Sequence, residues 1–189
     1  MSVRCPNLKG IVAALAVLVT YSLPVTAQSA DLQDEAELLT ALATADDAEA
    51  KRLDRQLTAV WSKSGSAAID LLLKRGRDAL EVGDIPTAIE HLTALTDHAP
   101  GFAEGWHARA SAYFGAELFG PAMADLERAL TLNPNNYNAI FGLGAILETF
   151  GKDGLAYEAY QRALALHPHH EGAIQATERL KTQIEGRSL

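Results

Sequence analysis

The sequence predicts an all-α fold in which similar helix-turn-helix units are stacked one on another. Three prolines, Pro100, Pro134 and Pro168, follow one another at a constant interval of 34 residues. Between them, apolar residues recur three and four positions apart, as they do on one face of an amphipathic helix. A constant period of this size indicates one small unit repeated along the chain, and such stacks present binding surfaces rather than active sites.

Alignment on the prolines divides residues 69–170 into three units, at residues 69–102, 103–136 and 137–170. Each unit has a small residue at the same position of its first predicted helix, which lets the second helix pack closely. These residues are Gly76, Ala110 and Gly144. Two of the turns between the helices contain a glycine, Gly83 or Gly151, which favours the positive φ of a tight turn.

Residues 1–27 have the pattern of a secretory signal peptide. Arg4 and Lys9 precede an apolar run, and small residues ending at Ala27 suit cleavage after that residue. The apolar run is shorter than the roughly 20 residues of a membrane span. We therefore expect an exported protein, in a bacterial periplasm; the alternative is an uncleaved anchor.

Removal of this segment would change the chemistry of the chain. It contains Cys5, the one cysteine, so the mature chain would have no disulfide or thiol chemistry. It also carries two basic residues and no acidic one, so the net charge would fall from −8 to −10. This negative charge argues against nucleic acid or an anionic membrane surface as the partner of the mature form.

Residues 28–66 read as a degenerate helical hairpin before the repeats. Two apolar stripes are separated by Asp46 and Asp47, which suit the N-cap of the second helix. We expect this hairpin to cap the N-terminal end of the stack. The alternatives are a mobile arm or a dimerisation element. Residues 171–189 read as a final capping helix and a short tail.

The middle unit carries the clearest motif. It reads Trp106-x-x-Arg109-Ala110-x-x-Tyr113, then Ala122-x-x-x-Leu126-x-x-Ala129, then Asn133-Pro134. This pattern resembles the tetratricopeptide repeat (TPR), which has the same period, and the resemblance covers residues 69–170. It implies a right-handed superhelical stack with peptide or protein ligands in a concave groove. Arg109, at a usually apolar position, and Glu117, in place of a turn glycine, depart from the pattern.

In TPR stacks the first helix of each unit lines the groove, so the resemblance assigns ligand contacts to that helix. The predicted groove residues are Leu73, Arg77, His107, Phe114, Asn138, Phe141 and Glu148. Leu73, Phe114 and Phe141 are apolar yet lie outside the core pattern, which suggests contact with apolar groups of a partner. The alternative is that the N-terminal hairpin or the last helix covers them.

Some TPR domains hold a C-terminal carboxylate through lysines and asparagines of the groove. Three of the corresponding positions here are Leu73, His107 and Phe141, so a ligand of that kind is not expected. The sequence also has no nucleophile motif and no phosphate-binding glycine loop. We therefore predict a non-catalytic interaction scaffold without cofactor or metal, whose oligomeric state the sequence does not indicate.

Two other functions remain open from the sequence. One is an accessory subunit of a cell-envelope enzyme or assembly complex, docked through the hairpin around Leu57, Val60 and Trp61. The other is metal or small-molecule binding by the histidines of residues 167–170, a tract that can also be read as a polar loop.

Overall fold

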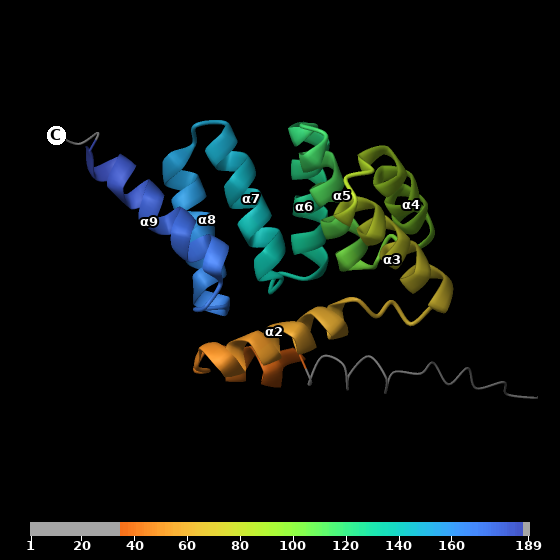
Figure 1. The fold of residues 1–189 in the computed structure, drawn as a ribbon, viewed down its shortest axis with the longest axis horizontal. Helices are drawn as coiled ribbons and strands as arrows, with labels where there is room; N and C mark the ends of the chain where they lie inside the picture. Colours follow the sequence, from red (N-terminus) through yellow and green to blue (C-terminus); the bar gives the residue numbers. More distant parts are fainter. Residues whose placement is uncertain (1–34, 187–189) are drawn as a thin grey trace, which may run out of the picture.

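The computed structural model describes residues 35–186, which are helical apart from short connections (Figure 1). The predicted signal peptide at residues 1–27 and the last three residues lie outside the described part. A first helix at residues 35–42 is followed by α2 (Asp47–Trp61), α3 (Ala67–Glu81), α4 (Ile85–His98), α5 (Ala103–Gly115), α6 (Phe119–Leu132), α7 (Tyr137–Thr149), α8 (Asp153–Leu166) and α9 (Glu171–Gly186). The predicted all-α fold is confirmed for this part of the chain.

The helices from α3 onward form a repeat stack (Figure 1). Helices α3 and α4, α5 and α6, and α7 and α8 pack as three antiparallel pairs, and α9 packs on α8. Helix α5 begins at Ala103 and α7 at Tyr137, the first residues of the second and third sequence units. Helix α3 begins two residues before the first unit, at Ala67. The 34-residue period therefore corresponds to one helix pair.

The pairs are close-packed because small residues in the first helix face large residues in the second. A Cβ atom at Gly144 would lie 2.6 Å from the ring of Tyr160, and one at Gly76 would lie 2.5 Å from Leu92. Both distances are too short for a side chain at the glycine. The close approach of the two helices therefore depends on these glycines.

The connections between paired helices share one backbone conformation. Gly83 and Gly151 have φ angles of 76° and 67°, and Glu117 adopts the same region with φ 59°. Glu117 thus takes the place of a turn glycine without changing the geometry, and it does so in a region that side chains disfavour. The replacement of the turn glycine by Glu117 therefore introduces local backbone strain but leaves the turn unchanged.

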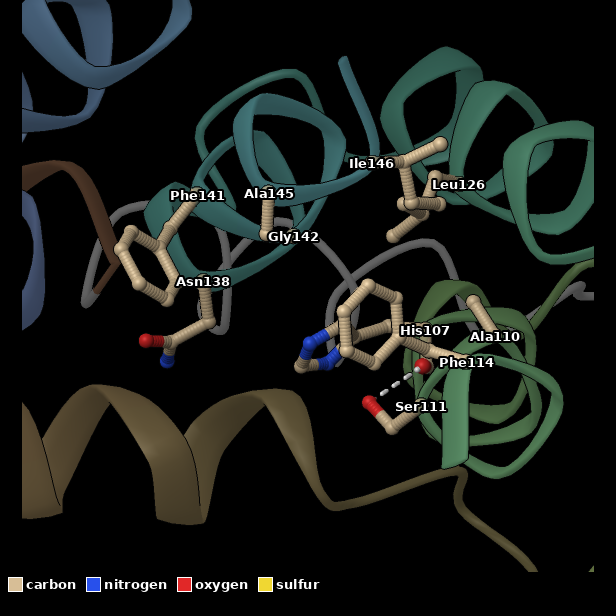
Figure 2. Close-up of a pocket in the computed structure, with 10 residues that line it drawn as sticks. All are labelled: His107, Ala110, Ser111, Phe114, Leu126, Asn138, Phe141, Gly142, Ala145 and Ile146. Carbon is tan, nitrogen blue, oxygen red and sulfur yellow. Dashed lines mark hydrogen bonds between the residues drawn. The ribbon is translucent and has the colours of Figure 1, made fainter. Parts of the chain in front are cut away.

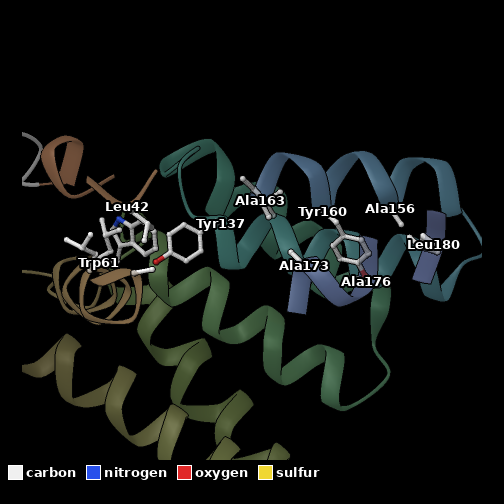
Figure 3. Packing of buried hydrophobic residues seen from close by; sticks show 13 residues of the cluster. Leu42, Trp61, Tyr137, Ala156, Tyr160, Ala163, Ala173, Ala176 and Leu180 are labelled. Carbon is white, nitrogen blue, oxygen red and sulfur yellow. The ribbon is translucent and has the colours of Figure 1, made fainter. Parts of the chain in front are cut away.

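The N-terminal hairpin is not at the N-terminal end of the stack, and this part of the sequence prediction is wrong. Its buried residues Leu53, Leu57 and Trp61 belong to the same apolar cluster as Tyr137 and Ile140 of the third pair (Figure 3). Helix α2 lies along the edge of the stack where one pair connects to the next (Figure 1). The apolar stripe of α2 takes this place because the start of α7 and the α8–α9 connection offer a matching surface.

Polar contacts fix the hairpin on this edge. The Tyr137 hydroxyl donates a 2.8 Å hydrogen bond to Asp54 of α2. His169 contacts the Ala45 carbonyl oxygen through Nε2 at 2.8 Å and Asp47 through Nδ1 at 2.5 Å. The α8–α9 connection therefore holds both ends of the turn that precedes α2.

Candidate functional site

The first helices of the second and third pairs enclose a cavity of about 370 Å³ on the concave side of the stack (Figure 2). Its lining is mostly apolar, with a few polar groups. The lining residues are His107, Ala110, Ser111, Phe114, Leu126, Asn138, Phe141, Gly142, Ala145 and Ile146. This composition suits an apolar side chain flanked by hydrogen-bonding groups.

Two phenylalanines stand on opposite sides of this cavity (Figure 2). Phe141 of α7 is held by Tyr160, with ring centroids 5.3 Å apart, and by His170 at 4.8 Å. Phe114 of α5 packs edge-on to Phe119 at 5.5 Å and remains 39% exposed. Phe141 is therefore a fixed wall, whereas Phe114 presents apolar surface to solvent.

A buried carboxylate links the first helices of the three pairs. Glu104 is 5% exposed and accepts hydrogen bonds from Arg77 of α3 and from Asn136, at 3.0 Å, next to α7. It also contacts Nδ1 of His107 at 3.1 Å. Burial alone raises the pKa of Glu104, but the charges and hydrogen bonds of His107 and Arg77 outweigh it and hold this pKa below its ordinary value. Glu104 is therefore an ionised link between three successive first helices.

The remaining polar groups of the cavity are engaged with the protein itself. The Ser111 hydroxyl donates to the backbone carbonyl of His107, not to its imidazole (Figure 2). Asn138 shares a 3.2 Å hydrogen bond with Nε2 of His170. Ser111 is thus not paired with a general base, as an activated nucleophile would be. The arrangement suits recognition of a ligand.

The structure brings together four of the seven predicted groove residues. His107, Phe114, Asn138 and Phe141 all line the cavity. Glu148 lies in an adjoining cavity of about 420 Å³, which shares Phe141 and Ala145 with the first. The Glu148 carboxylate is bound by Arg179 of α9, with contacts from 2.8 Å, and by the Tyr160 hydroxyl at 2.9 Å.

The other two predicted residues have structural partners. Leu73 is 2% exposed and packs in one cluster with Ala108 and Ala112 of α5, so it cannot contact a ligand and its assignment to the groove is wrong. Arg77 is bonded to Glu104 and to the Ser62 hydroxyl, the latter at 2.8 Å. The alternative interpretation, that the last helix covers the apolar groove residues, applies to part of Phe141, because Gly172 of α9 lies against its ring.

The sequence prediction missed three apolar contributors to the cavity. Ala110, Leu126 and Ile146 are buried core residues whose surfaces also form its floor. Leu126 comes from α6, a second helix, and reaches the cavity because Gly142 opposite it has no side chain: a Cβ atom there would lie 3.5 Å from Leu126. In the sequence, Gly142 is the signal that could have indicated access from the cavity to Leu126.

The histidines of residues 167–170 hold the hairpin and the last helix. His167 packs edge-on against Tyr137 at 4.9 Å, and His169 contacts Asp47 and Ala45. Burial lowers the pKa of His167. In the described part of the chain, no group of three or more His, Cys, Asp or Glu side chains is placed to hold a metal ion.

The alternative of docking through the hairpin is weakened by the same packing. Leu57 is fully buried and Trp61 is 8% exposed, both within this chain, so only Val60 of the three proposed anchors remains partly exposed. Within residues 35–186, none of the helices has the length and apolar character needed to cross a membrane.

Comparisons with known proteins agree with this architecture. A tetratricopeptide repeat model matches residues 103–136. The chain is 30% identical over 138 residues to a TPR repeat-containing protein of Rhizobium etli, covering 73% of this chain and 68% of that protein. The first TPR of Spaghetti (RPAP3), bound to an HSP90 peptide, is 27% identical with a TM-score of 0.60 and covers 64% of this chain and 95% of that one.

A more distant structure shows the same fold. The TPR domain of Sgt2 from Aspergillus fumigatus has a TM-score of 0.61 at 23% identity, with 65% of this chain and 83% of that chain covered. The 34-residue helix pairs, the glycine-mediated packing within them and the relative from Rhizobium etli lead to one assignment. The chain belongs to the tetratricopeptide repeat protein family.

Proposed function

We propose that this protein is a non-catalytic interaction scaffold that binds a peptide or protein segment in its concave groove. The observation that carries the proposal is the cavity between Phe114 and Phe141. Its apolar walls would bury one bulky side chain of the ligand. The lone pairs of the Ser111 hydroxyl and the amide NH2 of Asn138, which their internal hydrogen bonds leave available, would orient the ligand backbone.

Contacts within the chain hold the groove residues in place. Glu104 links Arg77, His107 and Asn136, and Phe141 is fixed by Tyr160 and His170. A preordered surface loses little conformational entropy on binding, so a few contacts give useful affinity. The peptide bound by the RPAP3 domain supports a peptide ligand for this chain, without implying that it is held by its C-terminal carboxylate.

We place this scaffold in a bacterial periplasm. The support is the pattern of residues 1–27, with its basic start, apolar run and small residues before Gln28. Sequencing the N-terminus of protein recovered from a periplasmic fraction tests this directly. A chain that begins at Gln28 supports export with cleavage, and a chain that keeps its apolar run contradicts it.

Binding of a ligand in the groove can be tested with a substitution that fills the cavity. Ala145 lines both adjoining cavities, so Ala145→Gln places a larger polar side chain where the ligand would lie. The matched control is Ala124→Gln on the exposed face of α6. Proteins captured from envelope extract by the wild type and by the control, but lost with Ala145→Gln, identify the groove ligand. Equal capture by all three forms would contradict binding in the groove.

A further inference from the structure

The exposed large apolar side chains gather on one edge of the stack. Five of the six in the described part of the chain lie near the turns between paired helices: Val82, Phe114, Leu118, Phe150 and Leu155. We call residues 81–85, 114–119 and 148–155 the turn edge. It lies at the top of Figure 1, on the side of the stack opposite to α2. The sixth residue, Leu71, is in α3 outside this edge.

The apolar groups of the turn edge are continuous from pair to pair. Phe119 packs edge-on with Phe114 at 5.5 Å and with Phe150 at 5.8 Å, which joins the second pair to the third. Ile85 of the first pair lies over Gly115, where a Cβ atom would be 3.0 Å from its Cδ1. The result is an apolar strip that crosses three pairs, not a scatter of single exposed residues.

Negative charge flanks this strip. The turn edge holds five carboxylates, those of Glu81, Asp84, Glu117, Glu148 and Asp153, and one lysine, Lys152. Arg179 offsets Glu148. Glu81 and Glu117 are exposed, and neither forms an ion pair or side-chain hydrogen bond with another residue of the described chain. The edge therefore combines apolar surface with two exposed, unpaired carboxylates, Glu81 and Glu117.

We propose that the turn edge binds a basic amphipathic helix of a partner protein, at a surface that extends beyond the concave groove. An apolar stripe on such a helix would cover Leu118, Phe119 and Phe150. Lysine or arginine side chains beside that stripe would face Glu81 and Glu117.

The charge decides between this occupant and two others. A second copy of the chain would bring the same carboxylates to the contact, and like charges facing each other are unfavourable. An anionic membrane surface would be repelled for the same reason. With a basic partner, apolar contact and electrostatic attraction both favour binding.

Two synthetic helical peptides test this proposal. They share one leucine stripe, and the polar face carries lysine in one and glutamate in the other. Fluorescence anisotropy with the full mature chain should show the lysine peptide binding at least about tenfold more tightly, with affinity falling as salt is added. Leu118→Ser with Phe150→Ser should weaken that binding by about tenfold or more. Serine suits position 118, which is the N-cap of α6, so the variant should stay folded.

The controls separate the turn edge from the rest of the surface and from the groove. Leu71→Ser removes an exposed leucine elsewhere, and Ala145→Gln blocks the groove; both should bind the lysine peptide as the wild type does. Loss of binding in Leu71→Ser, or equal affinity for the two peptides, would overturn the proposal. Two further results would also overturn it: a dimer of the wild type that the double variant abolishes, or binding of the wild type to phosphatidylcholine–phosphatidylglycerol vesicles that the double variant abolishes. Each result would show that the turn edge has another occupant.

Discussion

Trp61 and Tyr137 join the end of α2 to the start of α7, with ring centroids 5.1 Å apart and ring planes inclined by 60°. Burial raises the pKa of Tyr137, and so does its hydrogen bond to Asp54, so the hydroxyl stays a neutral donor. This aromatic pair and this hydrogen bond both help to fix the hairpin to the third helix pair.

Replacing Trp61 with alanine should destabilise the protein. The side chain is 8% exposed, and truncation of a large buried aromatic leaves a cavity that costs about 3 kcal/mol or more. Urea unfolding measures the change in the free energy of unfolding. Val82→Ala, at an exposed position, should change it by less than about 0.5 kcal/mol. A similarly small effect at Trp61 would mean that the hairpin is not part of the cooperative unit.

The ion pair of Arg109 and Asp125 should be strongly coupled. Arg109 donates to Asp125 from Nε at 2.7 Å and from Nη2 at 2.9 Å, and both side chains are largely buried. Asp125→Ala leaves a buried cation without its partner and should cost about 3 kcal/mol or more. Arg109→Met together with Asp125→Ala should cost less than the sum of the single changes. Additive losses in the urea midpoints would contradict this coupling.

The periodic part of the fold was predictable because it depends on local spacing. Residues three and four apart share a helix face, so the sequence alone placed Gly144 against the second helix of its pair. Leu73 was misassigned because the size of its neighbours decides its burial: Ala108 and Ala112 on α5 leave room for it. Such complementarity between helices is not visible in the periodicity of either one.

The place of the hairpin could not be predicted for a different reason. The contact of Trp61 with Tyr137 joins segments that are far apart in sequence and that follow no common repeat. The role of the histidines of residues 167–170 could not be predicted for the same reason. In the sequence, this tract suggested a metal site or a polar loop. The partners of His169, Asp47 and Ala45, lie in the hairpin and became clear only in the folded chain.

Glycine at position 117 should stabilise the protein. Glu117 has φ 59°, a conformation that costs a residue with a side chain about 1 kcal/mol or more. Glu117→Gly removes this strain but gives the unfolded chain more freedom, so the net gain should be below about 1 kcal/mol. Gly151→Ala, at φ 67°, should have the opposite effect. Thermal unfolding that shows a loss for Glu117→Gly would contradict the account of strain.

The stability of the protein should fall in mild acid because of His170. Its Nδ1 accepts a 3.0 Å hydrogen bond from the backbone N–H of Ala173 in the first turn of α9, and its Nε2 contacts Asn138. The neutral ring satisfies both partners, whereas a proton on Nδ1 would face the N–H of Ala173. Burial accordingly lowers the pKa of His170 below the ordinary value of 6.5.

The direction of the pH effect follows from this shift. As the pH falls through 6.5, the unfolded chain binds a proton at His170 before the folded chain does. The contribution of His170 to the free energy of unfolding is therefore fully present above pH 6.5. It decreases as the pH falls below this value, until the folded state is protonated as well. Urea unfolding at several pH values between about 7.5 and 5 should show the decline. His170→Asn keeps a residue suited to the helix N-cap and should make the decline smaller, with the part due to the lowered pKa of His167 remaining. His98→Asn, at an exposed position, should leave the decline unchanged. An unchanged decline in His170→Asn would assign the pH dependence to another group.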